Sequence, residues 1–269
     1  MILVTGASGT IGSAVLRQLV AQGIPVRGMS RSAREGFVRG DFGDVASLRL
    51  ATSEVDAVFL LTAPGPWVAE HDLAMVAAAS GVRRIVKLSA IGTGPGLPAE
   101  WHAVGEEAVR SRDGGWTILR PSGFMSNTLR WVPAVRAGQI PNQTGDGAHA
   151  FIDPEDVAAV AVAALLSSER DGQTYTLTGP ELLSVPDQVA VLSEVLGRSL
   201  EVVDVPLKVY AEQLRAAGLD EAVVSVALRG AELIRNGGEK TLTHDVEQVL
   251  GRPAGTFRAW AETHRAAFQ

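Results

Sequence analysis

The chain has 269 residues, of which 46% are hydrophobic and 20% are charged, and its formal net charge at pH 7 is −6. These values are typical of a globular protein with a large buried core, and the negative charge argues against nucleic acid as a partner. The absence of cysteine excludes disulfides, thiolate metal ligands and cysteine nucleophiles. No apolar run reaches membrane-spanning length and Met1 leads directly into the first predicted strand without a signal peptide, so we expect a cytoplasmic protein with no membrane partner.

A glycine turn follows the first predicted strand. Residues 2–5 (ILVT) are apolar, and Gly6, Gly9 and Gly12 come next at three-residue spacing, where an amphipathic helical pattern begins. Strand, turn and helix in this order predict a dinucleotide-binding motif. The first glycine allows the tight turn, the second lets the backbone approach a pyrophosphate, and the third lets the helix pack against the strand. The N–H groups at the helix N-terminus then face the phosphates. The cofactor residues predicted here are Gly6, Ser8, Gly9, Thr10, Ile11 and Gly12.

Arginines follow the second predicted strand, residues 26–29. In a Rossmann unit the end of this strand lies beside the adenosine ribose, where an NAD site places an acidic residue. This chain has Arg31 and Arg34 instead, which suit a 2′-phosphate through charge-assisted hydrogen bonds. The pattern therefore predicts NADPH as the cofactor, the alternative being two solvated surface arginines.

A third strand is expected at residues 37–40, with Asp41 at its end. Asp41 is a candidate acceptor for the adenine amino group, although an aspartate here can also simply form a turn. Asp44 is placed to cap the helix that follows.

Further apolar strands are expected at residues 55–61, 85–90 and 116–120, separated by helical patterns near 68–79 and 101–112. Apolar strands that alternate with helices predict an α/β fold, a Rossmann-type doubly wound parallel sheet covered on both faces. Ligands bind such sheets at the carboxyl ends of the strands. The cofactor residues expected along this edge are Leu61, Thr62, Ser89, Ala90, Pro121, Gly123 and Phe124.

The alternation of strands and helices is less regular in the second half of the chain. Asp153 and the proline after it predict a helix start, residues 173–177 a strand, and Ser184 the cap of another helix. A short strand is expected at residues 200–203, and residues 207–268 are mostly helical in pattern.

Two parts of the chain are expected from this organisation. Residues 1–150 form the dinucleotide-binding domain. Residues 151–269 are a mixed segment that completes the sheet and forms a small C-terminal α+β substrate lobe, to which segments between 123 and 150 also contribute.

Together these residues resemble the NmrA-like branch of the atypical short-chain dehydrogenases, over essentially the whole chain. The resemblance is carried by the Gly6/Gly9/Gly12 turn, Arg31, Asp41 and residues 58–62 (VFLLT), 87–90 (KLSA), 118–121 (ILRP), 124–127 (FMSN) and 175–180 (YTLTGP). This branch includes NADPH-dependent quinone reductases, triphenylmethane-dye reductases and natural-product ketoreductases. It also includes regulators that bind the dinucleotide without turning it over. The resemblance implies the fold and an NADPH cofactor, and it leaves the substrate open.

The proton donor of ordinary short-chain dehydrogenases is missing. Their Tyr-x-x-x-Lys pair supplies a proton from the tyrosine, but neither Tyr175 nor Tyr210 has a lysine four residues later. In relatives a lysine or histidine near the helix at 101–112 approaches the nicotinamide ribose, and His102 is the matching residue. His102 is therefore the candidate catalytic residue, as proton donor or ribose anchor. The alternative is a surface or core histidine.

An aromatic substrate is expected from the remaining candidates. The side chains apolar or flat enough to line its pocket are Trp67, Phe124, Met125 and Trp131, each of which can alternatively be plain core. Hydride transfer requires an acceptor held at reacting distance, and a quinone spreads the incoming charge over its own π-system. We therefore expect an NADPH-dependent reductase of a quinone or related aromatic carbonyl, a monomer or homodimer with no metal.

Two alternatives to a quinone reductase stay open. One is a ketoreductase or imine reductase acting on a natural-product intermediate. The other is a non-catalytic, NADP-sensing regulator of the NmrA type. His102 favours an enzyme, and the net negative charge argues against direct DNA binding. Neither argument excludes a regulator that binds another protein.

Overall fold

The computed structural model describes residues 1–32, 34–238 and 240–269, which form two compact units. The first unit comprises residues 1–121, 154–177 and 248–251, and the second comprises residues 122–153, 178–247 and 252–269. The chain therefore passes between the units several times rather than once near residue 150. The segment at 154–177 belongs to the first unit because it supplies that unit with a helix and an edge strand.

The first unit is built on a seven-stranded sheet of order β10-β6-β5-β4-β1-β2-β3, in which every pairing is parallel. Its strands are β1 (Ile2–Val4), β2 (Val26–Ser30), β3 (Phe37–Arg39), β4 (Ala57–Leu60), β5 (Arg84–Leu88), β6 (Gly115–Pro121) and β10 (Gln173–Leu177). The order reverses between β1 and β4, which is the switch point of a doubly wound sheet. The predicted Rossmann-type fold is confirmed.

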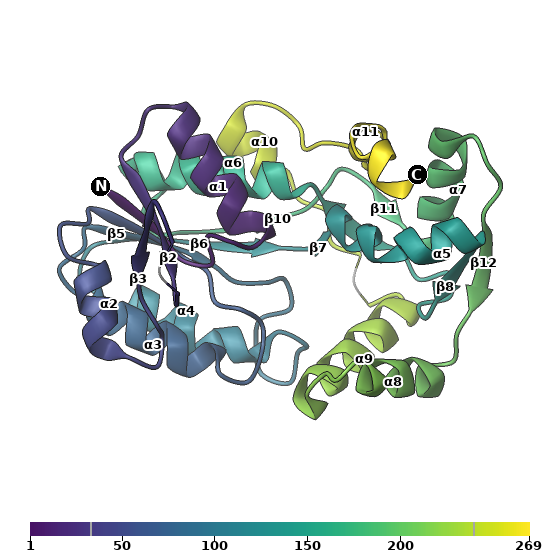
Figure 1. Ribbon diagram of the computed structural model, residues 1–269, viewed down its shortest axis with the longest axis horizontal. Coiled ribbons are helices and arrows are strands. Elements are labelled where there is room, and N and C mark those ends of the chain that lie inside the picture. The colour runs from purple at the N-terminus through teal and green to yellow at the C-terminus, as the bar shows by residue number, and fades with distance from the viewer. Residues whose placement is uncertain (33, 239) are drawn as a thin grey trace. The chain divides into compact units, whose positions relative to one another are not determined.

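Helices cover both faces of this sheet (Figure 1). Helices α1 (Thr10–Ala21) and α6 (Pro154–Leu166) pack together on one face. The other face carries α2 (Val45–Ala51), α3 (Val68–Ala78) and α4 (Ala103–Arg110). Two short 3-10 helices, η1 (Glu100–His102) and η3 (Ser168–Arg170), complete the unit. Because both faces are covered, β1 and β4 are buried along their whole length.

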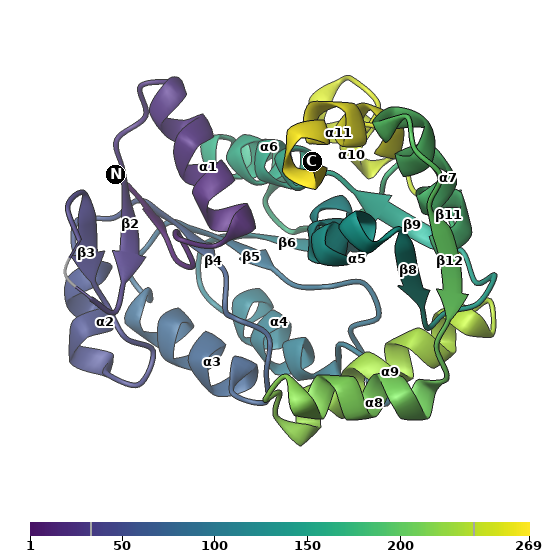
Figure 2. The same ribbon diagram turned by 45° about the vertical axis from the view of Figure 1, so that its right-hand side comes forward.

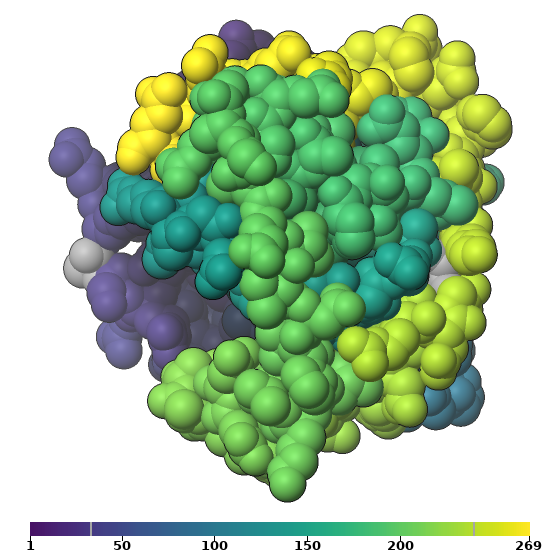
Figure 3. Space-filling model, turned by 90° about the vertical axis from the view of Figure 1, so that its right-hand side faces the viewer, coloured from purple at the N-terminus to yellow at the C-terminus, as the bar shows by residue number. Residues whose placement is uncertain are grey.

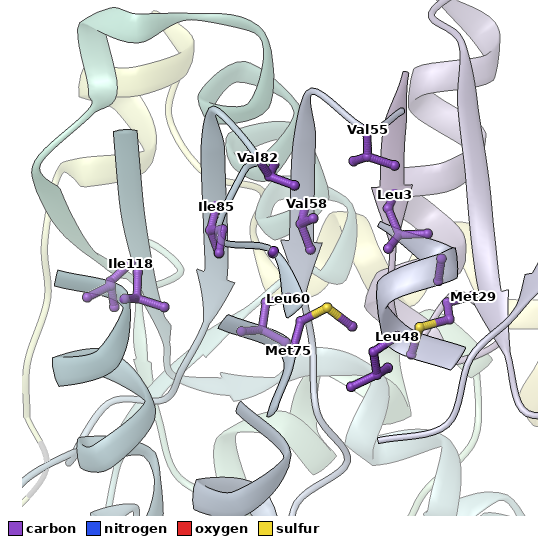
Figure 4. Close-up of a cluster of buried hydrophobic side chains, with 13 residues drawn as sticks. Leu3, Met29, Leu48, Val55, Val58, Leu60, Met75, Val82, Ile85 and Ile118 are labelled. Carbon is purple, nitrogen blue, oxygen red and sulfur yellow. The ribbon is translucent and has the colours of Figure 1, made fainter. Parts of the chain in front are cut away.

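An aliphatic layer joins the sheet to α2 and α3 (Figure 4). Leu3, Val58 and Ile85 extend from adjacent parallel strands, and Leu48 of α2 and Met75 of α3 pack in the same cluster. All five side chains are fully buried. Close packing of this layer fixes the strands, and so it also fixes the loops that leave their carboxyl ends.

The second unit combines two small sheets with helices. Its strands are β7 (Gly123–Phe124), β8 (Gln139–Asn142), β9 (His149–Ile152), β11 (Leu182–Leu183) and β12 (Glu201–Asp204). They form a three-stranded sheet of order β11-β9-β7 and a β12-β8 pair. The helices are η2 (Met125–Trp131), α5 (Val132–Ala137), α7 (Val185–Leu196), α8 (Leu207–Ala216), α9 (Glu221–Arg235), α11 (Phe257–Thr263) and η4 (Arg265–Phe268). The short helix α10 (Asp245–Leu250) has residues in both units.

Helices α8 and α9 lie side by side in this unit (Figure 2). The green and yellow-green atoms that dominate the view in Figure 3 belong to the segment from α7 to α9. Within the parts of the chain described above, no helix is long and apolar enough to cross a membrane.

Several local predictions are confirmed by hydrogen bonds. The Asp44 side chain accepts from the backbone N–H groups of Ala46 and Ser47 at the start of α2. Ser184 and Asp187 form a reciprocal capping box at the start of α7, which ends at Gly197 in a left-handed conformation with φ +68°. These caps are encoded over three or four residues, which is why the sequence reveals them.

Candidate active site

The glycine turn has the geometry that a dinucleotide requires. Gly6 has φ +59°, a conformation that other residues adopt at a cost. A Cβ added to Gly12 would lie 2.2 Å from the Gly6 carbonyl oxygen, so α1 can approach the turn only because Gly12 has no side chain. Gly9 differs, because the only described atom close to its added Cβ would be the same oxygen, at 3.4 Å. The absence of a side chain at Gly9 therefore leaves room outside the turn.

The N-terminus of α1 is free to bind an anion. Gly9 is its N-cap, no side chain of the described residues caps the helix, and its first turn has no acidic residue. The predicted contributors Ser8 and Thr10 are exposed, whereas the side chain of Ile11 is buried and leaves only its backbone N–H for binding. Free N–H groups and the positive end of the helix dipole fit a phosphate group.

Thr5 fastens this turn to the end of β4, a role that sequence reasoning missed. Its hydroxyl donates to the Leu61 carbonyl at 2.8 Å and accepts from the Leu61 N–H at 2.7 Å. The Leu61 side chain in turn fills the space beside Gly6, where an added Cβ would lie 2.5 Å from Cδ2. Leu61, which is predicted to contact the cofactor, thus also packs against the glycine turn at Gly6.

The residues assigned to the adenosine end lie in the segments that follow β2 and β3, where Asp41 is half-buried. Arg31 and Arg34 are exposed, and neither forms an ion pair with another described residue. The Arg34 guanidinium lies 4.6 Å from the centre of the Phe37 ring. The Asp41 carboxylate accepts from the Gly43 N–H at 3.0 Å, so the turn-forming alternative holds for Asp41 in this structure. The remaining carboxylate oxygen still leaves a hydrogen-bond acceptor.

A buried ion pair lies below the carboxyl ends of β4 and β5. Lys87 Nζ lies 2.5 Å from Asp72 Oδ2, and neither side chain is exposed. Thr62, predicted to contact the cofactor, is buried and donates from its hydroxyl to Asp72 Oδ1 at 2.7 Å. A Cβ on Gly105 would lie 2.1 Å from Asp72 Oδ2, so the glycine makes room for the carboxylate. Sequence reasoning missed this pair, although a lysine inside an apolar strand was a signal that its amine would be buried.

A second buried carboxylate, Glu106 of α4, collects three donors. Ser89 donates to Oε1 at 2.6 Å, Arg120 donates to both oxygens at 2.9 and 2.6 Å, and Arg110 donates to Oε2 at 2.7 Å. Burial alone opposes ionisation of Glu106, but these hydrogen bonds outweigh it and hold its pKa below the usual range. Ser89 therefore holds a fixed position at the end of β5, and Ala90 follows it at the edge predicted for the cofactor.

His102 is buried at the junction of η1 and α4. It is 7% exposed, and its Nδ1 has no hydrogen-bond partner among the described residues. Burial first, and the charge of Lys87 second, lower its pKa to about 3 against the opposing effect of Glu106. The imidazole is therefore neutral near pH 7, and the surface-histidine alternative is wrong. A neutral ring can still donate one hydrogen bond and accept another.

The side chains proposed to line an aromatic pocket do not share one environment. Trp67, 40% exposed in the first unit, donates from Nε1 to the Ala63 carbonyl at 3.0 Å. Met125 is 1% exposed and packs in the core of the second unit, so the core alternative holds for it. Trp131 lines a cavity in that unit, and Phe124 is half-buried in β7. Pro121 closes β6 of the first unit, whereas Gly123 and Phe124 belong to the second.

A parallel sheet that reverses order beside a glycine turn and an uncapped helix N-terminus defines a dinucleotide-binding protein. A family model described as NAD(P)H-binding matches residues 6–168, and the chain belongs to this family. It is 39% identical to a (4-alkanoyl-5-oxo-2,5-dihydrofuran-3-yl)methyl phosphate reductase of Streptomyces griseus, covering 100% of this chain and 99% of the relative. It is 33% identical to an NAD(P)H azoreductase of Xenophilus azovorans, with the same coverage of 100% and 99%.

Solved structures share the fold. An NADPH-dependent quinone oxidoreductase of Escherichia coli, complexed with NADPH, superposes with a TM-score of 0.85 at 24% identity, covering 99% of this chain and 100% of that one. The triphenylmethane reductase of a Citrobacter species gives a TM-score of 0.84 at 23% identity, with the same coverage of 99% and 100%. The resemblance to NmrA-like atypical short-chain dehydrogenases is thus confirmed, and the protein is an NAD(P)H-dependent oxidoreductase.

Proposed function

We propose that this protein is an NADPH-dependent reductase that transfers a hydride to a quinone or a related aromatic carbonyl. The observation that carries the proposal is the missing proton donor. Tyr175 of β10 and Tyr210 of α8 are not followed by a lysine four residues later, and His102 is buried as a neutral imidazole. An acceptor that spreads the incoming charge over its own π-system needs a proton donor least.

In this proposal the first unit supplies the groups that bind the cofactor. Bound NADPH supplies the hydride from C4 of its nicotinamide. Gly9 and the free N–H groups of α1 hold the pyrophosphate, and Arg31, with Arg34 three residues later in the sequence, pairs with the 2′-phosphate. Ser89, fixed by Glu106, and the neutral His102 offer hydrogen bonds to the nicotinamide ribose. Solvent provides the proton that completes a hydroquinone.

The names of relatives support conjugated acceptors in general. An azoreductase reduces an azo group, which, like a quinone, belongs to an extended π-system. In the substrate named for the Streptomyces griseus reductase, the ring double bond of the dihydrofuran is conjugated with a ring carbonyl and an alkanoyl group.

This last relative favours a second candidate function. At 39% identity over the whole chain, it supports reduction of a small unsaturated lactone or similar natural-product carbonyl. The expected chemistry is the same, because hydride again adds to a conjugated system. The two candidates differ in the size and charge of the acceptor rather than in the reaction class.

The test is NADPH oxidation by the purified protein with a panel of acceptors: 2-methyl-1,4-naphthoquinone, an azo dye, an acylated butenolide and the unconjugated ketone cyclohexanone. We expect at least one conjugated acceptor to exceed cyclohexanone by about 100-fold or more in kcat/KM, the lower range of general-acid catalysis. A Gly9→Val variant gives the background rate. Equal rates with cyclohexanone and all conjugated acceptors, or no NADPH oxidation with any of them, would contradict the proposal.

A further inference from the structure

The second unit contains a cavity of about 490 Å³, and every residue that lines it belongs to that unit. Its walls come from η2, from β8, β9 and the segment between them, from the start of α7, from Val205 and from α8 and α9. This volume is within the range of sites for small organic molecules.

Polar groups without partners lie at this cavity. Gln188 of α7 is fully buried, and neither its amide oxygen nor its amide nitrogen has a hydrogen-bond partner among the described residues. The Nδ1 atom of His149 is buried and unpartnered in the same way. Burial lowers the pKa of His149 to about 4, so this ring is neutral. Buried polar groups normally find partners, and two such groups at one cavity point to hydrogen bonds supplied by a ligand or by water bound there.

The described residues that line the cavity carry positive charge only. Among the described residues that line it, Arg130 is the only one with a formal charge at neutral pH, and none is acidic. Arg130 forms no ion pair with any described residue. Tyr210 lines the same cavity; burial raises its pKa while the nearby charge of Arg130 opposes that rise, so the phenol stays protonated as a donor. An unpaired guanidinium beside neutral donors suits an anion.

Apolar side chains form the rest of the wall. Trp131 and Phe151 offer flat surfaces, and Val185, Leu214 and Ile234 are aliphatic. Phe151 is held against the His149 ring, with 3.9 Å between the ring centres. A ligand that fits these walls therefore has an apolar body as well as an anionic group.

We propose that this cavity is a binding site for an organic anion, a small molecule with an apolar body that bears a carboxylate or phosphate group. The anionic group pairs with Arg130, the body packs between the apolar walls, and a polar atom of the ligand forms hydrogen bonds with Gln188 and His149. The site lies within the second unit, and the inference does not depend on the proposed function.

Binding is tested by isothermal titration calorimetry on the full chain in the presence of NADP⁺. The probes are 2-naphthoate, 2-naphthyl phosphate and the neutral 2-naphthamide, which share one apolar body. We expect at least one anion to bind about tenfold or more tightly than the amide at low salt, with the carboxylate and phosphate arms deciding which group is preferred. Arg130→Gln should remove this difference and leave the amide unaffected. Gln188→Leu should weaken all probes that bind.

Arg136→Gln is the matched control, because Arg136 is an exposed arginine of α5 that does not line the cavity. Equal affinity for the amide and both anions, or an equal loss in the Arg130→Gln and Arg136→Gln variants, would overturn the anion site.

Discussion

Lys87 and Asp72 form an ion pair in which neither side chain is exposed to solvent, with 2.5 Å between Nζ and Oδ2. The pair joins β5 to α3, and the hydroxyl of Thr62 satisfies the second carboxylate oxygen. Removing two charges from water is costly, so the pair is stable only while both partners are present. The same lysine also lowers the pKa of His102, which links the core of the first unit to the candidate catalytic residue.

Asp72→Ala should therefore reduce the free energy of unfolding by about 3–5 kcal/mol, because it leaves the Lys87 charge buried without a partner. Urea unfolding monitored by circular dichroism measures the change. Asp56→Ala is the control, since Asp56 makes its ion pairs with Arg83 and the N-terminus at the surface and should change stability little. A loss in Asp72→Ala as small as that of the control would show that the buried pair contributes nothing.

The buried neutral His102 should make the protein less stable in acid. Its pKa in the folded protein is about 3, against 6.5 in the unfolded chain, so the unfolded state binds the proton first as pH falls. The contribution of His102 to the free energy of unfolding is fully present above pH 6.5. It declines below this pH and is reduced by about 2 kcal/mol at pH 5. Unfolding of wild type and His102→Gln at pH 8 and pH 5 measures the effect. A wild-type stability that declines no more than that of the variant would contradict the assignment.

His102→Ala should lower kcat/KM by about tenfold or more, whichever of its two roles holds. Because the imidazole is neutral, we expect the signature of a ribose anchor: a higher Kd for NADPH and equal slowing of quinone and ketone reduction. A proton donor would instead show a pH dependence that the mutation removes and a larger loss for the ketone. Steady-state kinetics with both acceptors between pH 5 and 9 distinguish them. Unchanged kinetics would mean that His102 takes no part.

Arg31→Ala should weaken NADPH binding by about 1.5–3 kcal/mol, the range for hydrogen bonds to charged groups, and leave NADH binding nearly unchanged. The difference arises because only NADPH carries the 2′-phosphate. Fluorescence titration with both cofactors measures it, and Arg34→Ala should show a smaller effect in the same direction. Equal losses for the two cofactors would make Arg31 a structural residue.

Gly9→Val and Gly12→Ala should separate binding from folding. Gly9 has φ −86° and open space beside it, so valine should leave the fold largely intact but occupy the position of the pyrophosphate. Gly12→Ala places a methyl group 2.2 Å from the Gly6 carbonyl oxygen and should lower the melting temperature. Calorimetric melting and NADPH titration of both variants test this. Normal NADPH affinity in a folded Gly9→Val variant would place the nucleotide elsewhere.

The amino-acid sequence by itself determined the features whose cause is local. The strand, glycine turn and helix at residues 2–12, the Asp44 cap and the Ser184 capping box each depend on residues a few positions apart. Strands that are apolar along their whole length and alternate with helices were enough to predict the doubly wound sheet. A strand lacks alternating polar side chains only when both of its faces are buried. The glycine turn and the arginines after the second strand predicted NADPH, and the family resemblance implied the same cofactor.

Only the tertiary structure decided which side chains meet. Lys87 and Asp72 are 15 residues apart and lie in a strand and a helix, so no periodicity in the sequence pairs them. The tertiary structure likewise placed Met125 in the core of the second unit. It also brought Arg130, His149 and Gln188, from three separate segments of the chain, to one cavity. Long-range packing also set the charge of His102, since the pKa of a histidine depends on burial and on neighbours that the fold supplies.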